Sequence, residues 1–205
     1  NPETGKIFDE VWVEKRLGEI GNTITGLTYK PEMVTDHDGL LVLRSSNIKN
    51  NQILLVDKVF VKADNFAKIS LTKKNDILIC VRNGSKNLIG KNVMINNESE
   101  GFAFGAFMLV FRSKMNNFLI NHFNSNLYKK QVSKNLGATI NSINTKDLKK
   151  FKFLIPPIIE QTAIAEVLET SSNEIELLQE QLQQLLLQKK GLMQVLLSGE
   201  KRLVG

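Results

Sequence analysis

The sequence predicts an α+β protein in which a strand-rich globular domain is followed by one long helix. Two patterns and a boundary support this prediction. Short apolar runs broken by polar turns fill most of the 205 residues, and apolar residues at helical spacing fill the rest. Pro156-Pro157 separates the two patterns, because proline is tolerated in a first helical turn but not inside a helix. We therefore expect two domains, residues 1–155 and residues 156–205.

The strands expected in the first domain are short apolar runs bounded by turn-forming residues. Residues 76–81 are the clearest case, because a continuous apolar run of this length is typical of a strand buried on both faces. The segment 21–28, rich in glycine, threonine and asparagine, is expected to be a loop. The other expected strands and extended segments cover residues 40–44, 53–56, 59–61, 88–95, 107–112 and 151–155.

Helices are expected at three places in the first domain. Apolar side chains at helical spacing predict one helix over residues 116–131. Its buried face would consist of Leu119, Phe123 and Leu127. An aspartate at the start of residues 64–68 is a suitable cap for a short helix, and a helical turn is expected at residues 145–148.

Cys80 is the only cysteine, so neither an internal disulfide nor a cysteine-based zinc site can form. We interpret it as a small buried hydrophobic residue on a strand, because nothing in the sequence links it to His37 or His122. Trp12 and most of the 11 phenylalanines are also expected in the core.

In the second domain the apolar residues keep a four-three spacing, which predicts a heptad seam along the whole helix. The residues expected to mediate dimerisation along this seam are Ile164, Leu168, Ile175, Leu178, Leu182, Leu185, Lys189, Leu192 and Leu196. Such a helix is about 55–60 Å long, too long for a domain of this size to cover its whole face. We therefore expect a partner helix; the alternative is an ordinary long core helix.

The balance of 27 Lys+Arg against 21 Asp+Glu gives a net charge of +6, which favours a polyanionic partner. Nucleic acid is the first candidate and an anionic membrane surface the second. The sequence has no apolar stretch long enough to cross a membrane and no signal-peptide pattern at its start. With the low cysteine content, this indicates a cytoplasmic protein.

Polar turns of the first domain supply the side chains that DNA binding requires: cations for phosphates, and forked or amide groups for base edges. The candidate DNA-binding residues are Thr28, Tyr29, Lys30, Arg44, Ser45, Ser46, Asn47, Arg82, Asn83, Ser85, Lys86, Lys91, Lys134, Asn135, Thr139 and Asn141. Arg44 and Arg82 are the candidates for base readout, because a guanidinium can bond guanine with two hydrogen bonds. The lysines are candidates for phosphate contacts. The alternative is that these turns are merely solvated.

Motifs of catalysis and cofactor binding are absent from the sequence. Gly84 and Gly90-Lys91 are one residue too far apart for a phosphate loop, and Asn92 stands where serine or threonine would hold magnesium. We find no dinucleotide-binding glycine motif, no methyltransferase motif and no carboxylate cluster typical of a nuclease. We therefore expect no cofactor, no metal and no catalytic centre.

Residues 154–161 read Leu-Ile-Pro-Pro-Ile-Ile-Glu-Gln and resemble the start of the long helix in specificity subunits of type I restriction-modification systems. The end of the chain agrees, with Lys189-Lys190, Leu192-Met193-Gln194 and Gly199. The same resemblance extends to the front of the chain. The matching segments there are Trp12, Leu17-Gly18-Glu19-Ile20, Thr25-Gly26 with Thr28, Leu43-Arg44-Ser45-Ser46-Asn47-Ile48, Asp76-Ile77-Leu78-Ile79 and Gly137-Ala138-Thr139.

The resemblance implies a target-recognition domain that reads one half of a bipartite site in double-stranded DNA. It implies that the long helix spaces the domains and docks methyltransferase subunits, which restriction (motor) subunits join. The chain has one recognition domain and one helix, which is half of a usual subunit, so it is either a natural half-subunit or a fragment. We expect a half to pair with a second copy or a second half through its seam. A second departure is that Tyr29 stands where proline often follows, with Pro31 later.

Two other hypotheses remain open at this stage. The chain could be a non-catalytic coiled-coil adaptor whose globular part binds protein, which the basic charge and the polar turns disfavour. It could also be a methyltransferase or nuclease fused to a recognition domain, which the missing cofactor motifs disfavour.

Overall fold

The computed structural model describes residues 11–62, 70–136 and 141–202, and its fold is α+β, as the sequence predicts. The chain divides into two compact units, Asn1–Thr162 and Ala163–Gly205. In chain order the strands and α-helices are β1 (Val13–Arg16), α1 (Leu17–Ile20), β2 (Asn22–Thr25), β3 (Val34–Thr35), β4 (Leu40–Leu43), β5 (Ile48–Lys49), β6 (Gln52–Ile53), β7 (Phe60–Val61), β8 (Ile77–Cys80), β9 (Asn92–Met94), β10 (Ala103–Phe104), β11 (Met108–Arg112), α2 (Asn116–Phe123), α3 (Asn126–Asn135), α4 (Thr145–Lys149), β12 (Lys152–Ile155) and α5 (Ile158–Leu197).

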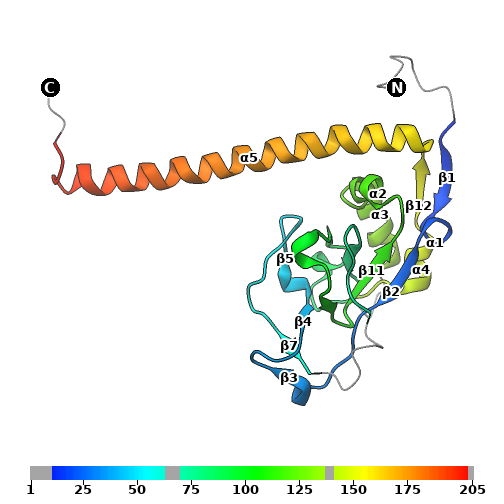
Figure 1. Cartoon of the computed structure of the whole chain (residues 1–205). Helices are drawn as coiled ribbons and strands as arrows, with labels where there is room; N and C mark the ends of the chain where they lie inside the picture. Colours follow the sequence, from blue (N-terminus) through cyan, green and yellow to red (C-terminus); the bar gives the residue numbers. More distant parts are fainter. Residues whose placement is uncertain (1–10, 63–69, 137–140, 203–205) are drawn as a thin grey trace. The chain divides into compact units, whose positions relative to one another are not determined.

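An antiparallel sheet of order β2-β11-β8-β9 forms the centre of the first unit, and β2 and β11 lie side by side in Figure 1. Leu109 of β11 faces Thr25 on one neighbouring strand and Ile79 on the other. All four residues of β8 are buried, which confirms the buried strand predicted at residues 76–81 and the interior position of Cys80.

A second sheet of order β10-β4-β7-β3 packs its own apolar cluster around Val42, Val61 and Ala103. The larger core cluster joins residues of β4, β8, β9, β10 and β11. Strands β1 and β12 pair at residues 13–16 and 152–155, so the beginning of the first unit lies against its end (Figure 1).

The single helix predicted over residues 116–131 is wrong, because the chain forms two helices there. Helix α2 ends at Phe123, and the Ser125 side chain accepts a hydrogen bond from the Tyr128 backbone N–H, which caps α3. Serine in this position competes with helix continuation and favours a new N-terminus. Leu127 is therefore 49% exposed instead of buried, and Tyr128 takes the interior position, donating its hydroxyl to the Gly90 carbonyl.

Three other local expectations also need correction. Residues 22–25 of the expected loop form β2, because they pair with the buried strand β11. The strand expected at 53–56 ends at Ile53, and the three apolar residues after it are exposed. The strand expected at 88–95 is reduced to β9, since Gly90, with a φ of +83°, turns the chain just before it. The helix expected at 64–68 lies outside the described residues.

Trp12 was expected in the core, but it is 38% exposed. Its indole Nε1 donates a hydrogen bond of 3.0 Å to Glu160. The indole N–H needs a polar partner, and this carboxylate at the start of α5 supplies one at the surface of the first unit. Of the 11 phenylalanines, those at 104, 111, 118, 123, 151 and 153 are buried.

Arg112 and Asp76 form a forked ion pair that fixes the end of β11 against the start of β8. The Asp76 carboxylate accepts from Arg112 Nε at 2.7 Å and from Nη2 at 2.6 Å, and it also accepts from the Lys73 N–H at 2.8 Å. Its side chain is 2% exposed. Removing one partner of such a pair leaves an uncompensated charge in the protein interior.

We expect Asp76→Asn to lower the free energy of unfolding by about 3 kcal/mol, the lower end for a buried pair because Arg112 is one-third exposed. Urea unfolding of the variant and the wild type measures this difference. Glu14→Gln is the matched control, since the Glu14–Lys152 pair is exposed on both sides and should contribute less than about 1 kcal/mol. Equal losses in the two variants would contradict the role given to Asp76.

Burial lowers the pKa of His122, and a hydrogen bond with the Leu154 backbone opposes this shift only in part. The imidazole lies between the rings of Phe118 and Phe153, at centroid distances of 5.0 and 4.8 Å. The folded state therefore binds a proton less readily than the unfolded state. The stability that neutral His122 contributes is fully present above the pKa of the unfolded state, near 6.5. It decreases as the pH falls from there to the lower pKa of the folded state.

We expect acidification from about pH 7.5 to about pH 5.5 to lower the melting temperature of the wild type more than that of His122→Phe. Thermal unfolding followed by circular dichroism at both pH values measures the two shifts. The same shift in both proteins would show that His122 does not carry the effect.

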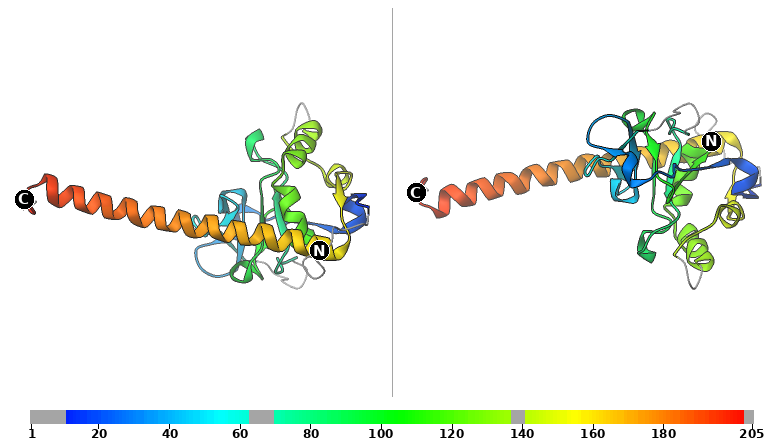
Figure 2. Two further views of the ribbon diagram at one scale, coloured as in Figure 1. Left: turned by 90° about the horizontal axis from the view of Figure 1, so that it is seen from above. Right: turned by 90° about the horizontal axis from the view of Figure 1, so that it is seen from below.

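Helix α5 has 40 residues and a length of about 60 Å, which confirms the long helix predicted from the heptad spacing. Figure 2 shows it uninterrupted in both views. It begins one residue after Pro157, whose carbonyl accepts from the Gln161 N–H, and the buried Gln161 side chain donates to the Pro156 carbonyl at 2.8 Å. Within the described ranges, no helix combines the length and apolar character needed to cross a membrane.

Candidate nucleic-acid interface

The turn between β10 and β11 connects two of the polar segments singled out in the sequence. The Gly105 N–H donates to the Leu43 carbonyl at 3.0 Å, next to Arg44. The carbonyl of Phe104 accepts from the Leu27 N–H at 2.7 Å, next to Thr28. These bonds explain why two segments far apart in the sequence approach the same turn.

The third segment joins the same turn through Phe107. Its carbonyl accepts from the backbone N–H groups of Val81 and Arg82, at 2.9 and 3.1 Å. The Arg82 guanidinium carbon lies 5.8 Å from the centre of the Phe107 ring, within the range of a cation–π contact.

Side chains then tie these loops into one group. Asn83 Nδ2 donates to Ser45 Oγ at 3.0 Å, and Lys91 Nζ donates to the Ser45 carbonyl at 3.4 Å. The Asn83 N–H donates to the Asn141 carbonyl at 3.2 Å, and Asn141 Nδ2 donates to the Gly84 carbonyl at 2.8 Å. The polar loop cluster, as we call this group, consists of Arg44, Ser45, Arg82, Asn83, Lys91 and Asn141.

Arg44 and Asn47 hold the edge of the polar loop cluster in place. Asn47 is 3% exposed, and its amide nitrogen donates to the carbonyls of Leu54 and Val56 while its oxygen accepts from the Arg44 N–H. Arg44 Nη2 donates to the Asp57 carbonyl at 2.8 Å. The Asn47 side chain is thus occupied inside the protein, and Arg44 is half-buried, with its Nε buried and without a hydrogen-bond partner among the described residues.

The other candidate residues differ in exposure. Thr28, Lys30, Ser46, Ser85 and Lys86 are exposed on the segments that the cluster joins. Tyr29 is partly buried and packs against the core of the second sheet.

Lys134 and Asn135 are exposed at the end of α3, where the Asn135 amide donates to the Gln131 carbonyl. In the described part of the chain, no hydrogen bond joins these two residues to the polar loop cluster. Thr139 lies outside the described residues.

Phe107 is the residue of this region that the sequence analysis missed. Its ring is 55% exposed, although it opens the apolar run that continues into β11. The sequence reading placed phenylalanines in the core by default, and Gly105-Ala106 before it was the only signal of a turn.

The interior below the polar loop cluster offers no reactive group. The Cys80 thiol donates to the Arg82 carbonyl at 3.5 Å, and burial raises the pKa of Cys80, so the thiol stays protonated at neutral pH. In the described ranges, histidine, cysteine and carboxylate side chains form no group of three that could hold a metal ion. The cluster can therefore bind through cations and hydrogen-bond donors.

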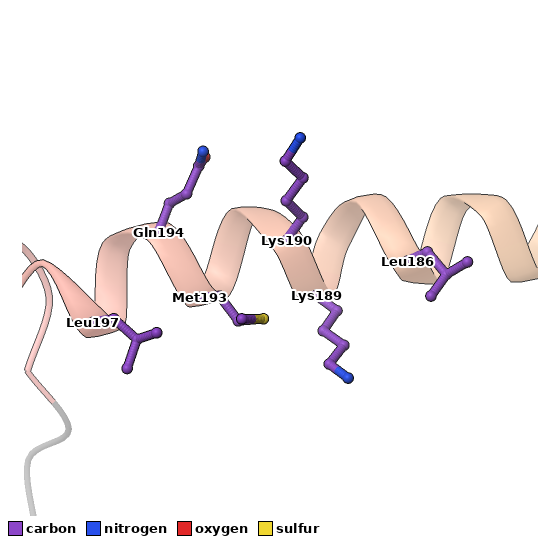
Figure 3. A pocket seen from close by; sticks show the side chains of 6 residues that line it. All are labelled: Leu186, Lys189, Lys190, Met193, Gln194 and Leu197. Carbon is purple, nitrogen blue, oxygen red and sulfur yellow. The ribbon is translucent and has the colours of Figure 1, made fainter.

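Helix α5 carries the other candidate site. Seven leucine and isoleucine residues of the seam, from Leu168 to Leu196, are 38–61% exposed. Near the end of the helix Leu186, Met193 and Leu197 widen this apolar stripe and line a shallow groove with Lys189, Lys190 and Gln194. In Figure 3, Lys190 and Gln194 point away from the side on which Met193 and Leu197 lie.

A strand-rich domain with converging cationic loops, followed by a long helix with an uncovered seam, suits a DNA-recognition module. The family model described as the type I restriction modification DNA specificity domain matches residues 9–187. The chain belongs to this family.

Two curated relatives agree with this assignment. The chain is 32% identical over 168 residues to the type I restriction enzyme EcoKI specificity subunit of Escherichia coli K12, covering 78% of this chain and 36% of that protein. It is 28% identical over 183 residues to the StySPI specificity subunit of Salmonella potsdam, covering 86% of this chain and 39% of the relative. The chain thus spans less than half the length of these relatives.

Solved structures share the fold. A chain from a study of complex assembly and conformational transition of the type I R-M system superposes with a TM-score of 0.69 at 20% identity, covering 95% of this chain and 46% of that chain. The HsdS subunit from Thermoanaerobacter tengcongensis superposes with a TM-score of 0.63 at 18% identity, covering 87% and 42%.

Proposed function

We propose that this chain is a non-catalytic DNA specificity module of a type I restriction-modification system, which reads one half of a bipartite site in double-stranded DNA. One observation carries the proposal: hydrogen bonds unite the loops of Arg44, Arg82, Lys91 and Asn141 into a single polar surface. The family match and the net charge of +6 support it. Such a subunit works in the cytoplasm, as the sequence predicts.

We assign three kinds of role to the candidate residues. Arg82 is exposed, so it suits a base edge in the major groove, and we assign the same role to the half-buried Arg44. Polar atoms of Ser45, Asn83 and Asn141 form hydrogen bonds with one another and with the backbone, so we assign these residues to positioning the loops. Phosphate contacts fall to the lysines: Lys30, Lys86, Lys91 and Lys134.

In our proposal residues 1–155 form the target-recognition domain. Residues 156–205 form the second domain, which pairs with a second chain and docks methyltransferase subunits. A two-residue seam in each heptad is typical of one partner helix, and the stripe widened by Leu186 and Met193 suits more than one. We propose a second copy of the chain on the seam and methyltransferase subunits on the widened end. Restriction (motor) subunits would join that complex. Two-fold pairing would place the two recognition domains on an inverted, symmetric site.

Binding-site selection from a random double-stranded DNA library tests the proposal. The chain is mixed with the methyltransferase subunits of its own system, because specificity subunits act in that complex. We expect one enriched bipartite sequence with inverted halves, and an affinity that falls steeply with salt as counterions are released. No enriched sequence, together with capture of a protein partner at the polar loop cluster, would favour the adaptor alternative and overturn the proposal.

A further inference from the structure

Phe107 is the most exposed aromatic side chain in the described part of the chain, at 55%. Its neighbours Phe104 and Met108 are almost completely buried, so the phenyl ring projects from a turn whose flanks are anchored in the core. Trp12, the next most exposed aromatic residue, has a hydrogen-bond partner in Glu160. The Phe107 ring thus exposes apolar surface inside a polar region.

The backbone holds this ring outward. The Phe107 carbonyl accepts from two N–H groups of the loop that carries Arg82, and the Met108 N–H closes the turn onto the Gly105 carbonyl at 2.8 Å. The same bonds place the Arg82 backbone beside Phe107, and the Arg82 guanidinium carbon lies 5.8 Å from the centre of the ring. Phe107 and Arg82 therefore form a neighbouring pair of one apolar and one cationic group.

We propose that Phe107 is a specificity-determining residue whose exposed ring contacts the C5 methyl group of a thymine, beside a guanine that Arg82 bonds. This inference rests on the proposed function of DNA reading. The thymine methyl is the apolar group that unmodified base pairs present in the major groove, and guanine presents two acceptors that fit a guanidinium. An apolar ring next to a forked donor matches a thymine next to a guanine.

The test uses the complex of the chain with its methyltransferase subunits and the DNA sequence enriched by selection. Each thymine of that sequence is replaced in turn by deoxyuridine, which removes only the methyl group. We expect the wild type to lose affinity by about four-fold at one thymine that adjoins a guanine, the effect of uncovering one buried methyl group. Phe107→Ala should bind the thymine and uracil forms equally, and Phe107→Leu should keep part of the difference.

Leu154→Ala is the matched control, because Leu154 is 51% exposed on β12 and its loss should leave discrimination at that thymine unchanged. Circular dichroism verifies that each variant is folded, and Phe107→Leu serves if the alanine variant is not. Wild type that tolerates uracil at every thymine, or a Phe107→Ala variant that still prefers thymine to uracil by the wild-type factor, would overturn the inference and leave DNA recognition intact. Failure of the wild type to enrich any sequence would overturn both proposals.

Discussion

Leu178→Lys combined with Leu182→Lys is expected to convert the proposed dimer into a monomer. Both leucines lie on the seam of α5 and are 55% and 54% exposed in the single chain, and pairing with a second copy would cover them. Each leucine buried in a pairing interface contributes about 1.5–3 kcal/mol. Two copies lose four leucines and bring four lysine charges into the seam. The dimer dissociation constant should therefore rise at least about 10⁴-fold.

Light scattering measures the outcome as a mass of one chain, 23.1 kDa, instead of two. Leu177→Lys combined with Leu187→Lys is the matched control, because these leucines are also exposed, at 55% and 68%, but lie off the seam. The control should remain a dimer. A seam variant that still has twice the chain mass would contradict pairing through α5.

Arg82→Ala is expected to abolish discrimination at one or two base pairs of the recognised sequence. A guanidinium that makes two hydrogen bonds to guanine contributes about 1–3 kcal/mol of discrimination against the wrong base, which is about 5- to 150-fold in relative affinity. Competition binding with DNA mutated at each position measures this loss. Arg82→Lys should also lose it, because an ammonium keeps the charge but not the forked donor.

Lys86→Ala is the control for Arg82→Ala, since this lysine is exposed on the same loop. We expect it to weaken binding to all sequences about equally and to lower the salt slope by about one. An unchanged sequence preference in Arg82→Ala, with the Lys86 variant behaving as expected, would contradict a role of Arg82 in base readout. Arg82 would then contribute to binding only through its charge.

Features that depend on residues close together in the sequence were predictable from it. The seam of α5 and the buried strand β8 follow from apolar periodicity, because a helix face or a strand face is defined by spacing alone. The residues around Pro156-Pro157 predicted where the long helix begins to within a few positions. The polar turns of Arg44 and Arg82 could be selected as candidates by residue type, but the sequence could not show that they lie together.

Tertiary contacts decided the rest. The polar loop cluster exists because Gly105 and Phe107 bond to segments about 60 and 25 positions earlier in the chain, and no local pattern encodes those bonds. Phe107 stays exposed in this turn, and hydrogen bonds with Arg44, Leu54 and Val56 hold the Asn47 side chain inside the protein. Both outcomes are opposite to what residue type favours. The break between α2 and α3 at Ser125 is set jointly by its cap and by the interior position of Tyr128. Spacing in the sequence thus determined elements such as α5 and β8, whereas packing determined which side chains meet and which remain exposed.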